Sequence, residues 1–366
     1  MILVVKIGST SLTNSTGNIS IQAIAKLSSE IAKLRADGVD VVVVSSAATS
    51  VGLKPLGYSI ADKPSDAATL RAAAAIGQIT ITGTYRQCLS TEGLEAAQIL
   101  LAPLDFWNRK RYLSSRELIK LLLDRGIVPI INENDALADQ DINFGDNDNL
   151  AALVAHLLDA DKLVLLTDID GFYSADPSTN PEAELIRLVD KITSELYDSA
   201  GGSNSDIGRG GMASKLSAAQ IASRSGVETV ICNSAADQVL SKCINDNQVI
   251  GTTFEPHSKK VSARKLWIGF ALAPSGKIVV DDGAKNALVN SNKSLLAAGM
   301  VSCSGDFSQG KLIEISDING RVFARGLTRW SSKEIISNSG KQSADTPNLS
   351  DEVVHKDDLV LLGLIS

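Results

Sequence analysis

The 366-residue sequence has few of the residues that carry metal and thiol chemistry. Its four cysteines are scattered without a CxxC pair, and it has three histidines that do not cluster. We therefore expect reduced thiols rather than a thiolate metal site. No apolar run approaches the ~20 residues of a membrane span. Met1 leads directly into an apolar segment, so no signal peptide is expected and the predicted location is the cytoplasm.

Aromatic residues and basic charge are also scarce. Aromatic residues make up 4% of the chain, hydrophobic residues make up 44%, and the net charge is −7. A negative chain is not typical of a protein built mainly to hold nucleic acid or an anionic membrane. The phosphate-binding pattern GxxxxGK[ST] is absent, which excludes a P-loop protein.

Apolar strands alternate with amphipathic helices through the first two thirds of the chain. Strands that are apolar throughout are typical of a parallel sheet buried on both faces. The pattern predicts an α/β fold with an open, mostly parallel sheet sandwiched by helices. The expected strands are residues 1–7, 39–44, 97–101, 127–131, 162–167, 228–232 and 251–254, and the expected helices include 20–38, 66–83, 114–125, 149–158, 213–225 and 236–244.

The character of the chain changes after residue 255. Residues 256–272 carry lysines and arginines without an acid in their central part, and are expected to form a basic linker. Short strands separated by glycine-containing turns follow, which predicts a second, small β-rich domain over residues 273–366. The first domain would then span residues 1–255.

An acidic, asparagine-rich loop lies between the strands 127–131 and 162–167. Asp146, Asn147 and Asp148 stand where the next helix should begin, and any one of them is a good helix cap. Capping does not account for the further polar residues of the loop, which are Asn132, Glu133, Asn134, Asp135, Asp139 and Asp141. Because such a loop repels itself unless it faces positive charge, we expect a site for a small substrate that carries an ammonium group.

Two lysines indicate a phosphate site. Lys6 ends the first strand, and Lys215 follows the glycine-rich segment 201–211 in the first turn of a helix. A glycine-rich loop at a helix N-terminus directs free N–H groups and the helix dipole at an anion. Each lysine alone has a purely structural explanation, but together on one parallel sheet they suggest a polyphosphate. The scarcity of histidine favours a carboxylate acceptor, which needs no general base.

These segments resemble the glutamate 5-kinases of the amino-acid kinase family. The resemblance rests on VVKIGS, INEND, FGDNDNLAA, LLTDIDGFYSADP and GRGGMASKLSAA, and covers residues 1–254. It implies ATP-dependent phosphorylation of the side-chain carboxylate of L-glutamate to L-glutamyl 5-phosphate, the first step of proline biosynthesis. The later motifs GKIVVDDGAKNAL and GRVFARGLTRWSS resemble a PUA domain.

The resemblance also implies roles for individual residues. Lys6 and Lys215 match lysines that bind ATP phosphates and stabilise the transferring group, and Asp148 matches the aspartate that holds both. The implied substrate-binding positions are Ser46, Asn132, Asp135 and Asn147. The implied ATP-binding positions are Lys6, Thr167, Asp168, Arg209, Gly210, Gly211, Met212, Ala213, Ser214 and Lys215. ATP is the implied co-substrate, with Mg²⁺ carried by ATP and no metal ligand from the protein.

One departure from the family pattern, the alanine at position 47, matters for the backbone. The family usually has Thr-Ser-Gly-Ala after the second strand, whereas this chain has Ser45-Ser46-Ala47-Ala48. Alanine at the glycine position is compatible with that loop if its φ is negative.

Alternatives to this interpretation remain open at this stage. The PUA-like domain could make the chain an RNA-binding protein, but residues 273–352 contain nine lysines and arginines and nine acidic residues. Tight RNA binding is therefore not expected. A sibling kinase acting on another carboxylate, such as aspartate or N-acetylglutamate, is the other alternative. The family further suggests a homo-oligomer and feedback inhibition by proline.

Overall fold

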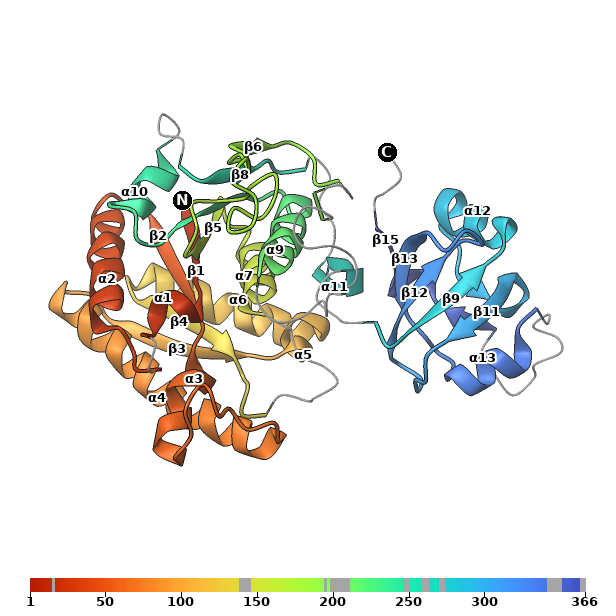
Figure 1. Ribbon diagram of the computed structural model, residues 1–366, viewed down its shortest axis with the longest axis horizontal. Helices are drawn as coiled ribbons and strands as arrows, with labels where there is room; N and C mark the ends of the chain where they lie inside the picture. The colour runs from red at the N-terminus through yellow and green to blue at the C-terminus, as the bar shows by residue number, and fades with distance from the viewer. Residues whose placement is uncertain are drawn as a thin grey trace. The chain divides into compact units, whose positions relative to one another are not determined.

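The computed structural model divides the chain into two compact units, Met1–Lys260 and Val261–Ser366 (Figure 1). The residues it describes are 1–14, 17–137, 146–193, 196–197, 211–245, 250–257, 263–266, 268–269, 274–340 and 351–362. The division falls within the segment expected to be a linker. That segment contains helix α11 (Ala263–Leu266), and the side chains of Leu266 and Ile268 are buried. Part of the segment therefore belongs to the structure of the second unit.

The first unit is built on an eight-stranded sheet with the order β3-β4-β2-β1-β5-β7-β8-β6. Every neighbouring pair is parallel except β7 and β8, so the prediction of a mostly parallel sheet is confirmed. The strands are β1 (Ile2–Ile7), β2 (Asp40–Ser45), β3 (Ala96–Leu101), β4 (Val128–Glu133), β5 (Lys162–Thr167), β6 (Leu188–Val189), β7 (Glu228–Asn233) and β8 (Thr252–Phe254).

Helices cover both faces of this sheet (Figure 1). Helices α2, α4 and α10 share a core with the side chains that β1 and β2 direct to one face, and helices α6, α7 and α9 pack on the other face. The helices of the unit are α1 (Ser9–Leu12), α2 (Ile21–Ala36), α3 (Ala48–Leu53), α4 (Ala67–Thr91), α5 (Pro103–Trp107), α6 (Arg109–Asp124), α7 (Asn147–Leu158), α9 (Met212–Arg224) and α10 (Val239–Ile244). None of the described helices is long and apolar enough to cross a membrane.

Two helix boundaries differ from those expected. Helix α6 begins at Arg109 rather than Ser114, because the Asn108 side chain accepts hydrogen bonds from the N–H groups of Lys110 and Arg111. Helix α4 continues past Gly83 to Thr91, since its packing against α2 and α3 outweighs the low helix propensity of one glycine. The cap expected at Ser20 is present, with its hydroxyl accepting from the N–H of Ala23.

Strand β1 occupies the centre of the sheet, between β2 and β5. Strands β2 to β4 lie on one side of β1, and strands β5 to β8 lie on the other side. The strand order therefore reverses at β1. Ligands bind in open α/β sheets beyond the carboxyl ends of the strands at such a reversal. The carboxyl ends of β1, β2, β4 and β5 therefore define where a site should lie.

The second unit is small and rich in β-structure, as predicted. Its five-stranded sheet has the order β11-β9-β12-β13-β15, and β10 pairs with β14 in a separate ladder. The elements are β9 (Gly276–Val280), α12 (Asp282–Ser291), β10 (Leu295–Leu296), β11 (Met300–Ser304), β12 (Leu312–Ser316), β13 (Val322–Leu327), α13 (Ser332–Asn338), β14 (Glu352–Val354) and β15 (Leu359–Leu361). Helices α12 and α13 were not anticipated from the sequence. The polar segment 337–350 was expected to be a loop, but its first two residues belong to α13, and residues 341–350 lie outside the described residues.

Candidate active site

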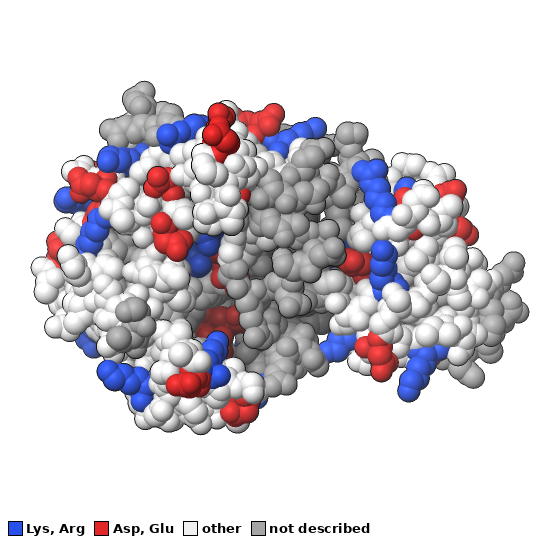
Figure 2. Space-filling model, in the orientation of Figure 1, with Lys and Arg blue, Asp and Glu red and all other residues white. Residues whose placement is uncertain are grey.

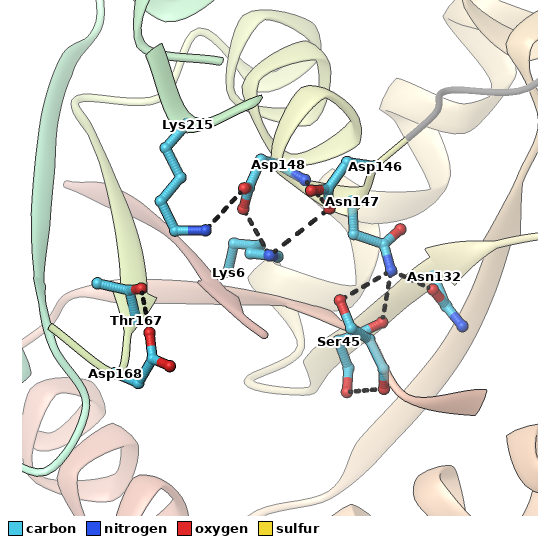
Figure 3. A network of polar contacts seen from close by, with 10 residues as sticks. Lys6, Ser45, Asn132, Asp146, Asn147, Asp148, Thr167, Asp168 and Lys215 are labelled. Atoms are coloured by element: carbon cyan, nitrogen blue, oxygen red, sulfur yellow. Dashed lines mark hydrogen bonds and ion pairs between the residues drawn. The ribbon is translucent and has the colours of Figure 1, made fainter. Parts of the chain in front are cut away.

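Two buried lysines and one buried aspartate meet beyond the carboxyl end of β1. Lys6 comes from β1, Asp148 from the first turn of α7 and Lys215 from the first turn of α9. The Asp148 carboxylate lies between the two ammonium groups, with one oxygen 2.5 Å from Lys6 Nζ and the other 3.1 Å from Lys215 Nζ (Figure 3). A single carboxylate thus fixes the positions of two cations from distant parts of the chain.

The electrostatics of this triad favour the charged forms of Asp148 and Lys6. Asp148 is fully buried and Lys6 is 3% exposed. Burial alone raises the pKa of Asp148, but the charges of Lys6 and Lys215 outweigh it, so the pKa lies below its usual value. Burial lowers the pKa of Lys6, but Asp148 and Asp146 outweigh it and the pKa is raised. Two positive charges share one carboxylate here, with Asp146 as a more distant partner of Lys6 at 3.7 Å.

Asp146 caps helix α7, and Asn147 and Asp148 do not. The Asp146 side chain accepts a hydrogen bond from the N–H of Asp148 at 3.2 Å. The three candidates for the cap are thereby separated: Asp146 caps helix α7, and Asn147 and Asp148 lie in its first turn with side chains directed elsewhere.

A second polar cluster adjoins the triad through Asn147. The Asn147 amide nitrogen lies 2.8 Å from Asn132 Oδ1, 3.1 Å from Ser46 Oγ and 3.2 Å from the carbonyl oxygen of Ser45. Figure 3 shows this amide directed at the end of β2 on the opposite side from the lysines. Three of the four substrate-binding residues expected from the sequence, namely Ser46, Asn132 and Asn147, are therefore brought together.

Asn147 also presents an acceptor that the described residues do not use. Its Oδ1 atom is buried and has no hydrogen-bond partner among the residues that the structure describes. An unpaired buried acceptor is unfavourable in the absence of a ligand. The cluster therefore favours a ligand that donates a hydrogen bond, such as an ammonium group.

Asp135 follows β4 and is half-buried. Burial raises its pKa to about 6 from a usual value of 3.8, and the charge of Lys63 opposes that shift. Its carboxylate is charged at neutral pH and becomes neutral in mildly acidic solution. The expected loop residues Asp139 and Asp141 lie outside the described part of the chain.

The residues expected to bind ATP lie at the carboxyl end of β5 and at the start of α9. The Thr167 hydroxyl donates to the Asp168 carboxylate at 3.1 Å (Figure 3). Asn233, which ends the neighbouring strand β7, donates to Asp170 at 2.9 Å and thus holds the loop after β5. The residues Gly211, Met212, Ala213, Ser214 and Lys215 begin or precede α9, whereas Arg209 and Gly210 lie outside the described residues.

Ala47 has a left-handed backbone at the position where the family pattern has glycine. Its φ is +78°, its side chain is buried, and it precedes the first residue of α3. The negative φ that would suit alanine is therefore not adopted. A non-glycine residue in this region is strained by about 1–2 kcal/mol. The loop after β2, which carries Ser46, is held in this conformation by its surroundings.

Replacing Ala47 with glycine should therefore be much better tolerated than an ordinary alanine-to-glycine change. Glycine relieves the strain, which offsets the lost methyl burial and the added freedom of the unfolded chain. We expect Ala47→Gly to retain at least about 1 kcal/mol more stability than Ala48→Gly, measured by thermal or urea unfolding. Ala48, also buried but in the first turn of α3, is the matched control. Equal losses in the two variants would contradict the strain.

Gln78 and Asn233 are polar partners of the site that the sequence did not indicate. Gln78 lies on α4 and accepts a hydrogen bond from the Asn132 amide at 2.7 Å. Neither residue stands in a recognisable motif, and Gln78 sits within an alanine-rich helix. A glutamine at a buried helix position was the one signal by which it could have been found.

Comparisons with known proteins show to which family the chain is similar. The sequence profile of the amino acid kinase family matches residues 1–233, and that of the PUA domain matches residues 276–349. A glutamate 5-kinase from Trichlorobacter lovleyi is 43% identical over 98% of this chain and 96% of the relative. One from Geobacter metallireducens is 42% identical over 98% of this chain and 97% of the relative.

A solved structure supports the fold alone. The UMP kinase from Bacillus anthracis superposes with a TM-score of 0.50 at 16% sequence identity, over 69% of this chain and 95% of that protein. The family profile spans more than half of the sequence, and relatives above 40% identity align over nearly its full length. The chain belongs to the amino acid kinase family.

Proposed function

We propose that the protein is an enzyme that transfers the γ-phosphoryl group of ATP to the side-chain carboxylate of L-glutamate. The product is L-glutamyl 5-phosphate, the first intermediate of proline biosynthesis. The observation that carries the proposal is the Lys6–Asp148–Lys215 triad beside an amide cluster in which Asn147 Oδ1 has no partner among the described residues. The names of the curated relatives support the choice of glutamate as the acceptor.

The chemistry requires charge neutralisation more than proton transfer. A glutamate carboxylate is already ionised at neutral pH, so one of its oxygens attacks the γ-phosphorus directly. A new P–O bond forms, the bond between the γ-phosphorus and the bridging oxygen breaks, and ADP leaves with the electron pair. Lys6 and Lys215 stabilise the negative charge on the transferring group and on the leaving oxygens. Asp148 holds both lysines in place through its two carboxylate oxygens.

Mg²⁺ would enter this site with ATP. Among the described residues no group of three or more histidine, cysteine, aspartate or glutamate side chains is arranged to hold a metal ion. Bound to the nucleotide, the ion would neutralise phosphate charge. Thr167, Asp168 and the residues that begin α9 are the proposed nucleotide contacts.

The substrate's ammonium group would be recognised by Asp135 and Asn147. An ammonium group has three N–H donors, and these two side chains provide a carboxylate and an amide oxygen that has no partner in the described part of the chain. Ser46 and Asn132 would complete the glutamate site. Acetylation of the amino group would remove the charge that Asp135 attracts, which argues against acetylglutamate as the substrate.

The pKa of Asp135 predicts a pH dependence of glutamate binding. Because this pKa is raised to about 6, the carboxylate is charged above pH 6 and loses its charge as the pH falls below it. The apparent KM for glutamate should therefore rise between pH 7 and pH 5, while the KM for ATP changes little. Initial-rate measurements at fixed Mg²⁺ over this range provide the test.

The matched variant is Asp135→Asn, which keeps the side-chain shape and cannot ionise. We expect its KM for glutamate at pH 7.5 to be about ten- to hundredfold higher, as for the loss of a charge-assisted hydrogen bond. Its KM should also lose the pH dependence seen in the wild type. A shift in the ATP constant with an unchanged glutamate constant would show that the loop after β4 serves the nucleotide.

A substrate panel tests the function as a whole. Coupled ADP release should depend on L-glutamate and be much weaker with aspartate, N-acetylglutamate or UMP. Trapping the product with hydroxylamine would identify the acyl phosphate. Preference for another acceptor would make the protein a sibling kinase of the same family.

The second unit is proposed to affect assembly or regulation rather than catalysis. Each residue given a role in catalysis lies within the first unit, between Lys6 and Lys215. Figure 2 shows lysine and arginine interspersed with aspartate and glutamate on the visible face of the first unit. The PUA-like unit is close to neutral, so tight, salt-sensitive RNA binding is not expected of it.

Homo-oligomerisation and proline inhibition complete the proposal. Strand β3 forms an edge of the sheet, and exposed leucines on β3 and α6 are the surface that association would bury, namely Leu100, Leu113, Leu118 and Leu121. Proline carries an ammonium group and an α-carboxylate, as glutamate does, although its ammonium is secondary. This suits competition at the Asp135–Asn147 site. Light scattering and inhibition kinetics test the two points.

A further inference from the structure

A chain of side-chain amides runs from helix α4 to the proposed substrate site. Gln78 donates through Nε2 to Thr82 Oγ1 at 3.1 Å and accepts through Oε1 from the Asn132 amide nitrogen at 2.7 Å. Asn132 in turn accepts through Oδ1 from the Asn147 amide nitrogen at 2.8 Å. The Asn147 amide nitrogen also donates to Ser46 Oγ and to the carbonyl oxygen of Ser45, where the chain of hydrogen bonds ends.

The direction of this chain is set by two backbone groups. The N–H of Glu133 lies 2.9 Å from Asn132 Oδ1, and an N–H can only donate, so this atom of Asn132 must be the oxygen. The carbonyl of Ser45 lies 3.2 Å from the Asn147 amide and can only accept, so that atom of Asn147 must be the nitrogen. Once both ends are fixed, the oxygen of Asn147 has one orientation, which is the unpaired one described above.

Gln78 fixes the orientation of the Asn132 amide from the side that faces away from the proposed substrate site. Asn132 is 2% exposed and Gln78 is 7% exposed, so water is a poor substitute for either partner. Without the Gln78 oxygen, the Asn132 nitrogen is a buried donor with no acceptor in this relay. Turning the Asn132 amide over does not help, because its nitrogen would then face the N–H of Glu133 and the nitrogen of Asn147.

We infer that Gln78 is a positioning residue that, through Asn132, holds the Asn147 oxygen towards the substrate and thereby selects ligands with a free ammonium group. This inference rests on the proposed function, in which glutamate is the acceptor. Helix α4, which carries Gln78, would then contribute to the selection for an amino group without contacting the substrate. Gln78 acts on substrate binding and has no role in phosphate binding.

The test compares glutamate with glutarate, which has the same two carboxylates and no amino group. Dissociation constants for both are measured by calorimetry on the full-length wild type and on Gln78→Met, which fills similar space without an acceptor. We expect Gln78→Met to weaken glutamate binding about tenfold, as for one lost hydrogen bond to a charged group. Glutarate binding and the KM for ATP should change less than twofold.

Three further variants keep the result interpretable. Gln78→Glu retains an acceptor for Asn132 and should restore glutamate binding to within threefold of the wild type. Gln87→Met makes the same substitution on the exposed face of α4 and should leave both constants unchanged. Gln78→Leu replaces Gln78→Met if the latter does not fold.

The outcomes separate this inference from the proposed function. Equal weakening of glutamate and glutarate, or a lowered melting temperature with unchanged binding, would overturn the positioning role. If Gln78→Met selectively loses glutamate binding but the wild type releases no ADP in response to glutamate, the relay is supported and the kinase proposal is overturned. A wild type that binds neither ligand would overturn both.

Discussion

Replacing Lys215 with alanine is expected to lower kcat by about 10²–10³, the cost of removing one preorganised charge from a transferring group. The KM for glutamate should change much less, because Lys215 lies on the side of Asp148 away from the Asn147 cluster, where the phosphates are proposed to bind. Steady-state kinetics with glutamate and ATP varied in turn provide the measurement. The fold should persist, since Asp148 keeps Lys6 as a partner.

The control for this variant is Lys33→Ala, which removes an exposed lysine from α2. It should have near-wild-type turnover and melting temperature. Near-wild-type turnover in a folded Lys215→Ala protein would remove Lys215 from the catalytic machinery and leave the triad as a structural ion network.

Asp148→Asn should abolish most activity and also lower stability. The substitution leaves Lys6 and Lys215 buried without the charge that neutralises them, and breaking a buried ion pair typically costs about 3–5 kcal/mol. We expect kcat to fall at least as far as in Lys215→Ala, because both lysines lose their fixed positions. Melting temperature and kcat should be measured on the same preparation, with and without ATP.

The matched control is Asp159→Asn at the opposite end of the same helix. Asp159 has φ +51°, a conformation that asparagine tolerates, and its ion pair with Arg116 lies near the surface. A surface pair contributes about 0–1 kcal/mol, so the control should be almost unaffected. If Asp148→Asn behaves like the control, Asp148 is merely a residue of the first helical turn.

The fold was predictable because its strongest signals are local. Each expected strand of the first unit is present within two residues of its expected bounds, because continuous apolar runs are typical of a buried sheet. The short strand β6 and the short helices α1, α3 and α5 were not expected. The second unit was less predictable. Its helices α12 and α13 are short, and the sequence around them carries the glycines and polar residues of turns.

The site was predictable where a motif coincides with a strand end. Lys6, Asp148 and Lys215 lie together as the resemblance implied, and so do Ser46, Asn132 and Asn147. Contacts that depend on tertiary packing could not be predicted from the sequence. Gln78 meets Asn132 only because α4 packs against the sheet, and the left-handed backbone of Ala47 follows from the loop around it rather than from alanine itself.

The central place of β1 in the sheet has a consequence for synthesis of the chain. Its first neighbour, β2, follows within about 40 residues, but its second neighbour, β5, pairs with it about 160 residues later. At the ~5–20 residues per second typical of translation, this interval is on the order of ten seconds or more. During that time one edge of an almost wholly apolar strand has no partner, and Lys6 has no counter-ion from α7. The emerging chain therefore passes through a stage in which a strand that is buried in the folded protein has an unpaired edge, and an unpaired apolar edge favours aggregation.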